Sequence, residues 1–141
     1  MKIICFDFGE KRIGVSVSDE SGTLAGGIKT LTVRGFKHAV ELSVTEVKNQ
    51  NAVKIVVGLP KNMDGSESKS AEKTRKFGTA LAEGTDLEVV YFDERMTTMQ
   101  AHMYLNSTEF FGKKRKGVID TLSAQIILQD YLDFEKNKNK N

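Results

Sequence analysis

The sequence predicts an α/β fold in which one mixed sheet of five strands carries helices on both faces. Three observations lead to this prediction. Residues 2–33 contain three stretches with the two-residue period of β-strands, and their short links favour antiparallel pairing. Beyond residue 36 the apolar period becomes that of helices. Two further apolar strands alternate with the helical segments, and strands joined through helices pair in parallel.

The first three strands are expected over residues 2–8, 13–18 and 23–33. In the first, apolar side chains occupy both alternating sets of positions, which is typical of a strand buried on both faces. Asp7 stands near the end of this strand. The second strand has one apolar face and one face of small residues, and the polar turn "DESG" leads from it into the third. These three strands should form an antiparallel meander.

A helix, a buried strand and a second helix should follow. The apolar stripe of the first helix consists of Phe36, Val40, Val44 and Val47. The short strand is "VKIVVGLP", residues 53–60. Asp64 and Glu67 have the spacing of a capping box, which predicts that the next helix opens there and continues through Phe77 and Leu81.

The last strand and the last helix complete the pattern. The strand is expected over residues 87–92, and Thr97 with Gln100 can cap a helix that follows it. The last helix is expected from about Val118 to Phe134. Together these elements predict a single domain over residues 1–135. The remaining residues, 136–141, are expected to form a polar C-terminal tail.

Composition narrows the class of protein. The 141 residues are 39% hydrophobic and 28% charged, as in ordinary globular proteins, and a net charge of +2 permits a nucleic-acid partner. Cys5 is the single cysteine, which excludes an intramolecular disulfide, and with two histidines a zinc centre is disfavoured. No apolar run approaches the roughly 20 residues that span a bilayer, and the N-terminus does not resemble a signal peptide. A cytoplasmic protein without membrane contact is expected.

Acidic residues follow the strands whose carboxyl ends should share one edge of the sheet, where ligands bind in open α/β folds. Asp7 ends the first strand, and Asp93 and Glu94 end the last. Asp120 lies in the first turn of the last helix, where the helix dipole favours an anion. Strand parity puts Asp93 and Glu94 on opposite faces, and the sequence leaves open which of them faces Asp7.

The chemistry of these acids depends on whether they meet. Each one alone occupies a position where structural caps are common. Three carboxylates at one edge would repel one another unless a divalent cation binds them, and Mg²⁺ prefers oxygen ligands. Paired metal ions of this kind stabilise the attacking and leaving oxygens of a phosphodiester, so the pattern predicts a hydrolytic nuclease site.

Basic residues stand beside these acids in the sequence. Lys11 and Arg12 follow Asp7, and the run "KKRK", residues 113–116, is expected to form a loop immediately before the last helix. A solvated charged loop is the structural alternative for such a run. Next to a nuclease site, the same residues would contact phosphates and position a nucleic-acid backbone without reading its sequence.

Four segments form an ordered pattern over the chain: "DFGEKRIGVSVSD", "IVVGLPKNMDGSE", "DERMTT" and "KRKGVIDTLSAQIILQDYL". In order and spacing they resemble the YqgF family of nucleases similar to Holliday-junction resolvases. The resemblance covers Met1 to about Asp133. It implies an RNase H-like fold, with Asp7, Glu94 and Asp120 as the metal-binding acids and Asp93 in reserve. Glu10 departs from the family, in which a threonine is common at this position.

The leading hypothesis is a nuclease that uses Mg²⁺ or Mn²⁺ and acts on structured RNA as a monomer or homodimer. The resemblance implies maturation of the 5′ end of precursor 16S ribosomal RNA. The backbone would be held by the basic residues Lys11, Arg12, Arg95, Lys113, Lys114, Arg115 and Lys116. Alternatives are a resolvase of branched DNA and a non-catalytic RNA-binding or ribosome-binding module. An ATP-binding domain of the actin type is disfavoured because 141 residues cannot supply its two halves.

Overall fold

The fold is that of the computed structural model, which describes residues 1–94 and 113–138, without the side chains of residues 28 and 113–121. Five strands form one sheet: β1 (Ile3–Asp7), β2 (Arg12–Ser18), β3 (Ala25–Thr32), β4 (Lys54–Leu59) and β5 (Val89–Asp93). Their order across the sheet is β3-β2-β1-β4-β5. Strands β1, β2 and β3 pair antiparallel, whereas β4 pairs in parallel with both β1 and β5. The predicted mixed sheet is confirmed.

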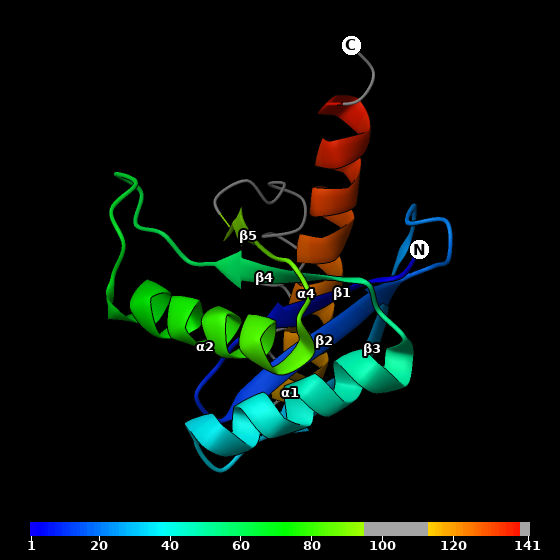
Figure 1. The fold of residues 1–141 in the computed structure, drawn as a ribbon. Coiled ribbons are helices and arrows are strands. Elements are labelled where there is room, and N and C mark those ends of the chain that lie inside the picture. Colours follow the sequence, from blue (N-terminus) through cyan, green and yellow to red (C-terminus); the bar gives the residue numbers. More distant parts are fainter. Residues whose placement is uncertain (95–112, 139–141) are drawn as a thin grey trace.

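Helices cover both faces of this sheet (Figure 1). Helices α1 (Phe36–Gln50) and α2 (Lys69–Thr85) lie on one face, and α4 (Lys113–Lys138) lies on the other. Because β1, β4 and β5 are parallel, their carboxyl ends share one edge of the sheet, toward which the arrowheads of β1 and β4 point in Figure 1. None of the described helices is long and apolar enough to cross a membrane.

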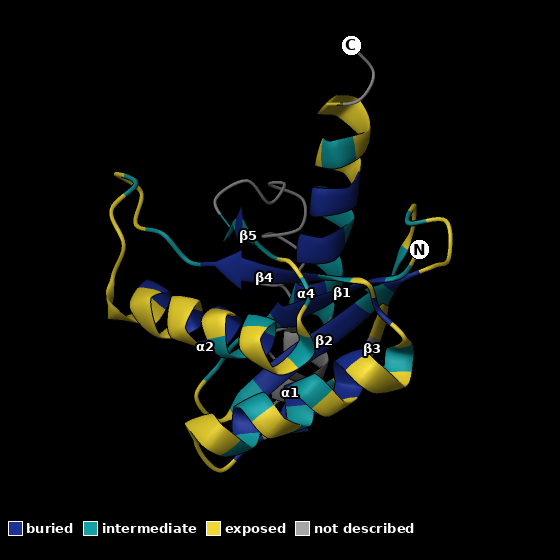
Figure 2. Ribbon diagram, viewed as in Figure 1, coloured by how far each residue is buried: buried dark blue, intermediate teal, exposed yellow. Residues whose placement is uncertain are grey.

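Two apolar cores hold these layers together, and the sheet between them is the most buried layer (Figure 2). Under α1 and α2, the ring of Phe77 is fully buried, with its centroid 5.9 Å from that of Phe6 and 4.5 Å from that of Phe8. Under α4, the core contains Cys5 and Ile127. The alternation of β1 between these cores shows that both of its faces are buried, as its sequence predicts.

Helix α2 begins later than its sequence predicts. Its N-cap is Ser68, so the expected capping box at Asp64 and Glu67 is wrong. The Asp64 carboxylate instead accepts hydrogen bonds from the backbone N–H and the hydroxyl of Ser66, at 2.9 and 2.6 Å. Asp side chains often bond the backbone two residues further on, and this local bond competes with a role at a helix N-terminus.

Helix α4 is longer than predicted at both ends. It begins at Lys113, so the basic run 113–116 is part of the helix and not a loop before it. Lysine and arginine are good helix formers, and one glycine in a helix costs only about 1 kcal/mol, which explains why Gly117 does not delimit it. At the other end the helix includes residues 136–138, where lysines favour a helix C-terminus. The division into a domain and a tail stays a prediction.

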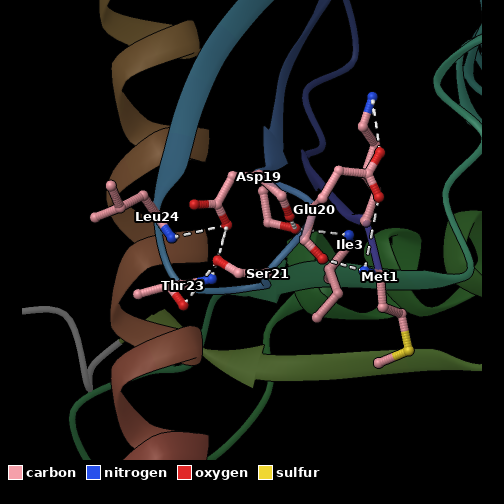
Figure 3. A network of polar contacts seen from close by, with 9 residues as sticks. Met1, Ile3, Asp19, Glu20, Ser21, Thr23 and Leu24 are labelled. Atoms are coloured by element: carbon pink, nitrogen blue, oxygen red, sulfur yellow. Dashed lines mark hydrogen bonds and ion pairs between the residues drawn. The ribbon is translucent and has the colours of Figure 1, made fainter.

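The β2–β3 turn lies at the end of the sheet opposite to the carboxyl edge of β1, β4 and β5, and a polar network holds it in shape (Figure 3). One carboxylate oxygen of Asp19 accepts hydrogen bonds from the Ser21 hydroxyl and the Thr23 backbone N–H, both at 2.9 Å, and from the Leu24 N–H at 3.3 Å. These bonds, led by that from Thr23, hold the pKa of Asp19 below its ordinary value. The ionised carboxylate therefore organises this turn.

We expect Asp19→Ala to lower stability in a pH-dependent way. Because the pKa of Asp19 is lower in the folded state, its stabilisation is complete above the unfolded pKa of about 3.9 and disappears as the pH falls through the folded value. Urea unfolding at pH 7, 5, 4 and 3.5 should show a gap from wild type that narrows below about pH 4. The control is Glu20→Ala, whose carboxylate makes longer ion pairs of 3.8 Å. A gap of constant size would contradict this role.

Candidate active site

Asp7 ends β1 on the face of the sheet that α4 covers. It has the same strand parity as Ile3 and Cys5, whose side chains belong to the core under α4. Unlike these two fully or largely buried residues, Asp7 is half-buried. Its carboxylate therefore lies where the α4-covered face meets the carboxyl edge of the sheet.

The structure resolves which acid at the end of β5 shares this face. Val90 and Phe92 pack in the core under α4, and Glu94 has the same parity. Asp93 has the parity of Tyr91, which packs against the core under α1 and α2. Contact geometry supports this assignment, since the Glu94 side chain lies over Gly58 beside Ile127 of α4. Glu94 thus faces the same side as Asp7.

Gly58 on β4 lets the side chains of Ile127 and Glu94 approach the strand between the two carboxylates closely. The pairing of Phe6 with Val57 and of Gly58 with Phe92 puts Gly58 between the end of β1 and the end of β5. A Cβ at position 58 would lie 2.9 Å from Ile127 Cδ1 and 3.4 Å from both Cγ and Cδ of Glu94. Strands separated by one neighbour are roughly 10 Å apart, a span that side chains from both sides can narrow.

Both carboxylates act electrostatically on one buried thiol, that of Cys5. Burial, followed by the Asp7 carboxylate, raises the pKa of Cys5 well above its ordinary value, and the Glu94 carboxylate acts in the same direction. Burial also raises the pKa of Glu94 itself, with a further contribution from the Asp93 carboxylate. A cation at this position would stabilise the ionised form of Glu94.

The course of α4 brings its N-terminal half toward the same edge. Ile127 lies against Gly58 near the carboxyl end of β4, whereas the Tyr131 hydroxyl accepts a hydrogen bond from the Lys54 ammonium at the other end of the strand. The helix therefore runs opposite to β4. Asp120 precedes Ile127 by seven residues, about two helical turns. Its backbone belongs to α4, while its side chain is outside the described residues.

The predicted phosphate contacts are only partly described. Lys11 is exposed in the loop between β1 and β2, and Arg12 is half-buried at the start of β2. Arg95 is outside the described residues, as are the helix expected to begin at Thr97 and the side chains of residues 113–116. The Glu10 carboxylate pairs with the ammonium of Lys73 on α2. The departure from the family at Glu10 therefore adds its charge on the α2 side of the sheet.

The role of Gly58 is not among the sequence predictions, although the sequence carries a signal for it. An isolated glycine inside a strand weakens that strand and often marks a close approach of other groups. Here the groups are the side chains of Glu94 and Ile127. Position 58 can therefore influence the candidate site without contributing a side chain.

We expect Gly58→Ala to disturb both stability and activity. The added methyl group would clash with Ile127 Cδ1 at 2.9 Å and touch the Glu94 side chain at 3.4 Å, and overpacking of this kind typically costs about 1–3 kcal/mol of unfolding free energy. Thermal unfolding and the rate of nucleic-acid cleavage would be measured together. Gly26→Ala is the matched control, because a Cβ there would meet the Val17 carbonyl oxygen at an ordinary 3.8 Å. Unchanged cleavage by Gly58→Ala would show that the close approach of Ile127 and Glu94 to β4 is not needed for activity.

The family model and the relatives described below show that this chain is a nuclease of the resolvase class, an enzyme that hydrolyses phosphodiester bonds. The chain belongs to the RuvX family, whose description is Holliday junction resolvase and whose family model matches residues 1–134. RuvX is another name for YqgF, so the resemblance found in the sequence is confirmed.

Several relatives carry the name "Putative pre-16S rRNA nuclease". One from Caldanaerobacter subterraneus subsp. tengcongensis is 46% identical over 138 residues, covering 97% of this chain and 99% of the relative. Another, from Clostridioides difficile, is 43% identical over 136 residues, covering 96% of each chain. The chain therefore spans nearly the whole length of these relatives.

Two solved structures share the fold at low sequence identity. RuvC of T. thermophilus in complex with a Holliday junction has a TM-score of 0.62 at 10% identity, covering 98% of this chain and 96% of that one. The Fowlpox virus resolvase, also solved with Holliday junction DNA, has a TM-score of 0.57 at 12% identity, covering 96% and 99%. These similarities confirm the predicted RNase H-like fold class.

Proposed function

We propose that this protein cleaves precursor 16S ribosomal RNA in a reaction that depends on Mg²⁺ or Mn²⁺. One observation carries the proposal: Asp7 and Glu94 share a face and an edge of the sheet, and the Glu94 side chain lies over Gly58 on the strand between them. The substrate class follows from the names of the relatives. The cytoplasmic location expected from the sequence stays a prediction of this proposal.

The donor set fits a hard divalent cation. Asp7 and Glu94 offer carboxylate oxygens, the ligands that Mg²⁺ prefers, and Asp120 would be the third ligand. Among the described side chains no cluster of three or more His, Cys, Asp or Glu residues gathers, so the set relies on Asp120. Asp93 remains in reserve. Bound divalent ions would activate a water molecule and stabilise the leaving oxygen of the phosphodiester.

Side chains of the protein would hold the metal ions and the substrate in position. Asp7 and Asp120 would hold the ions, and Glu94 would bind metal or orient the attacking water through its carboxylate. The substrate backbone would be held by Lys11, Arg12, Arg95 and the basic run 113–116. Contacts of this kind fix the position of a nucleic acid without reading its sequence, so the shape of the RNA would direct cleavage.

A cleavage panel tests this proposal. Precursor 16S fragments, single-stranded DNA and a four-way DNA junction would be incubated with the protein and Mg²⁺, Mn²⁺ or a chelator. We expect cleavage of the RNA near the mature 5′ end, no cleavage with chelator, and recovery when metal is restored. Binding of RNA without turnover under either ion would instead indicate a non-catalytic module.

A second candidate function is resolution of four-way DNA junctions, which the description of the family favours. Symmetric cleavage of two strands requires two active sites related by a two-fold axis, and hence a homodimer. Analytical ultracentrifugation with and without junction DNA decides between the two oligomeric states. A protein that stays monomeric on the junction would contradict this second function.

A further inference from the structure

A groove of about 800 Å³ lies on the side of the sheet opposite to the α4-covered acids. Its walls are the loop after β1, the turn that leads from β3 into α1, and the first half of α2. Asp7 and Phe8 are consecutive residues that point to opposite faces, so the groove begins one residue from the candidate site. A flexible chain that crosses the carboxyl edge at Asp7 would pass directly into it.

The floor of this groove is built from fixed elements. The ring of Phe8 stacks on Phe77 with centroids 4.5 Å apart and planes inclined by 28°. The Val33 backbone N–H donates to the Lys11 carbonyl oxygen at 2.9 Å, which ties the first loop to the end of β3. At Gly9 a Cβ would lie 2.5 Å from the Arg12 carbonyl oxygen, so this tight loop requires glycine. The groove is therefore formed before any ligand binds.

The rim of the groove is strongly basic. Five of its lining residues are cationic and one is acidic: Lys11, Arg12, Arg34, Lys73, Lys76 and Glu10. Glu10 is paired with Lys73. Within the described part of the chain, no ion pair engages Lys11, Arg34 or Lys76. The groove thus offers an excess of positive charge to a polyanion.

An aromatic ring stands at the mouth of the groove. Phe36, the first residue of α1, lines the groove and is 48% exposed. The N-cap of α1 is Gly35, no side chain caps this terminus, and no acid lies in the first helical turn. The positive end of the helix dipole therefore adds to the basic rim beside the exposed ring. Basic groups around an exposed aromatic ring are the features that bind single-stranded nucleic acids.

We propose that this groove, the basic groove, binds a single-stranded segment of the RNA substrate, with one base stacked on Phe36 and phosphates beside Lys11, Arg34 and Lys76. The proposal rests on the proposed function, because it assigns a path to the same RNA beyond the cleavage site. The apolar floor at Phe8 and Val33 suits a planar base, and the rim suits its backbone. An RNA segment next to the cleavage site would thus be held on the face of the sheet opposite to Asp7 and Glu94.

The test measures binding apart from cleavage. Fluorescence anisotropy with a labelled single-stranded RNA, in chelator, gives Kd for the full-length protein and its variants. Phe36→Ala should weaken binding about tenfold, as expected for one stacked base, and should leave the binding of an abasic oligonucleotide of equal length unchanged. The double variant Arg34→Ala/Lys76→Ala should weaken both oligonucleotides and lower the salt slope by about 1.4, or 0.7 for each phosphate contact.

Matched controls lie elsewhere on the surface. Phe134→Ala removes an aromatic ring that is 43% exposed on α4, and Lys48→Ala/Lys138→Ala removes two exposed cations. Both should bind RNA as wild type does, and thermal unfolding checks that every variant is folded. The inference is overturned if the variants in the basic groove bind RNA with wild-type affinity, or if Phe36→Ala weakens the abasic oligonucleotide equally. Displacement of the RNA by oligoglutamate of equal charge, with unchanged Kd for Phe36→Ala, would indicate a site for acidic peptides and also overturn it.

The groove inference and the nuclease proposal can fail independently, because binding and cleavage are measured separately. If the cleavage panel shows no turnover but the variants in the basic groove bind RNA weakly, the groove binds RNA and the nuclease proposal fails. If wild type cleaves RNA and these variants bind normally, the nuclease proposal stands and the groove inference fails. Under turnover the variants should raise KM and leave kcat nearly unchanged, because the contacts they remove are uniform binding contacts.

Discussion

Asp7→Asn should reduce cleavage of precursor 16S RNA by roughly 10³-fold or more, because loss of one charged metal ligand removes several kcal/mol of transition-state stabilisation. The amide keeps the shape of the side chain but loses the negative charge that would hold the cation. Single-turnover rates at saturating RNA would isolate this chemical step from binding.

The same substitution should leave the fold intact. Asp7 is half-buried, and asparagine keeps the size of its side chain. Because no volume is added or removed, the midpoint of thermal unfolding should stay close to that of wild type. Asp86→Asn is the matched control, since Asp86 is an exposed left-handed C-cap of α2, where asparagine fits well. Full activity of purified Asp7→Asn would contradict the site.

Glu94→Gln should lose far more activity than Asp93→Asn, although the two residues are adjacent. Glu94 lies over Gly58 on the α4-covered face, whereas Asp93 has the parity of the opposite face. We expect about a 10²- to 10³-fold fall in kcat for Glu94→Gln, as for other single groups that stabilise a transition state. For Asp93→Asn we expect less than a tenfold change, comparable to the effect of a neighbouring positioning group.

The measurement is again single-turnover cleavage, now with Mg²⁺ titrated over several decades. Glu94→Gln should need a higher metal concentration for its residual activity, and Asp93→Asn should follow the wild-type curve. A reversal, with Asp93→Asn inactive and Glu94→Gln active, would assign the site to the reserve acid. It would also mean that the chain turns at the end of β5 when metal or RNA binds.

Much of the fold could be predicted because strands and helices follow local periods. The alternation in β1 depends on neighbours along the chain and agrees with the structure. The predicted stripe of α1 is only partly right: Val47 is buried and Val40 and Val44 pack against the core, but Phe36 is exposed and Ala39 and Ser43 are buried in its place. Boundaries were less predictable, since local hydrogen bonds compete at helix ends. The Asp64 carboxylate bonds to Ser66 and leaves Ser68 as the N-cap of α2, a choice that the spacing of Asp64 and Glu67 does not reveal.

The sequence by itself determined the fold class, the family, and the position of Asp7 at the end of a buried strand. These depend on local periodicity and on the order of segments, which a single chain carries in full. Only the tertiary structure decided that Glu94 shares a face with Asp7, that Gly58 lets Glu94 and Ile127 approach β4 closely, and that the basic groove opens on the far side. Each of these depends on the register of strands and helices far apart in the sequence, which is set by packing across the whole sheet.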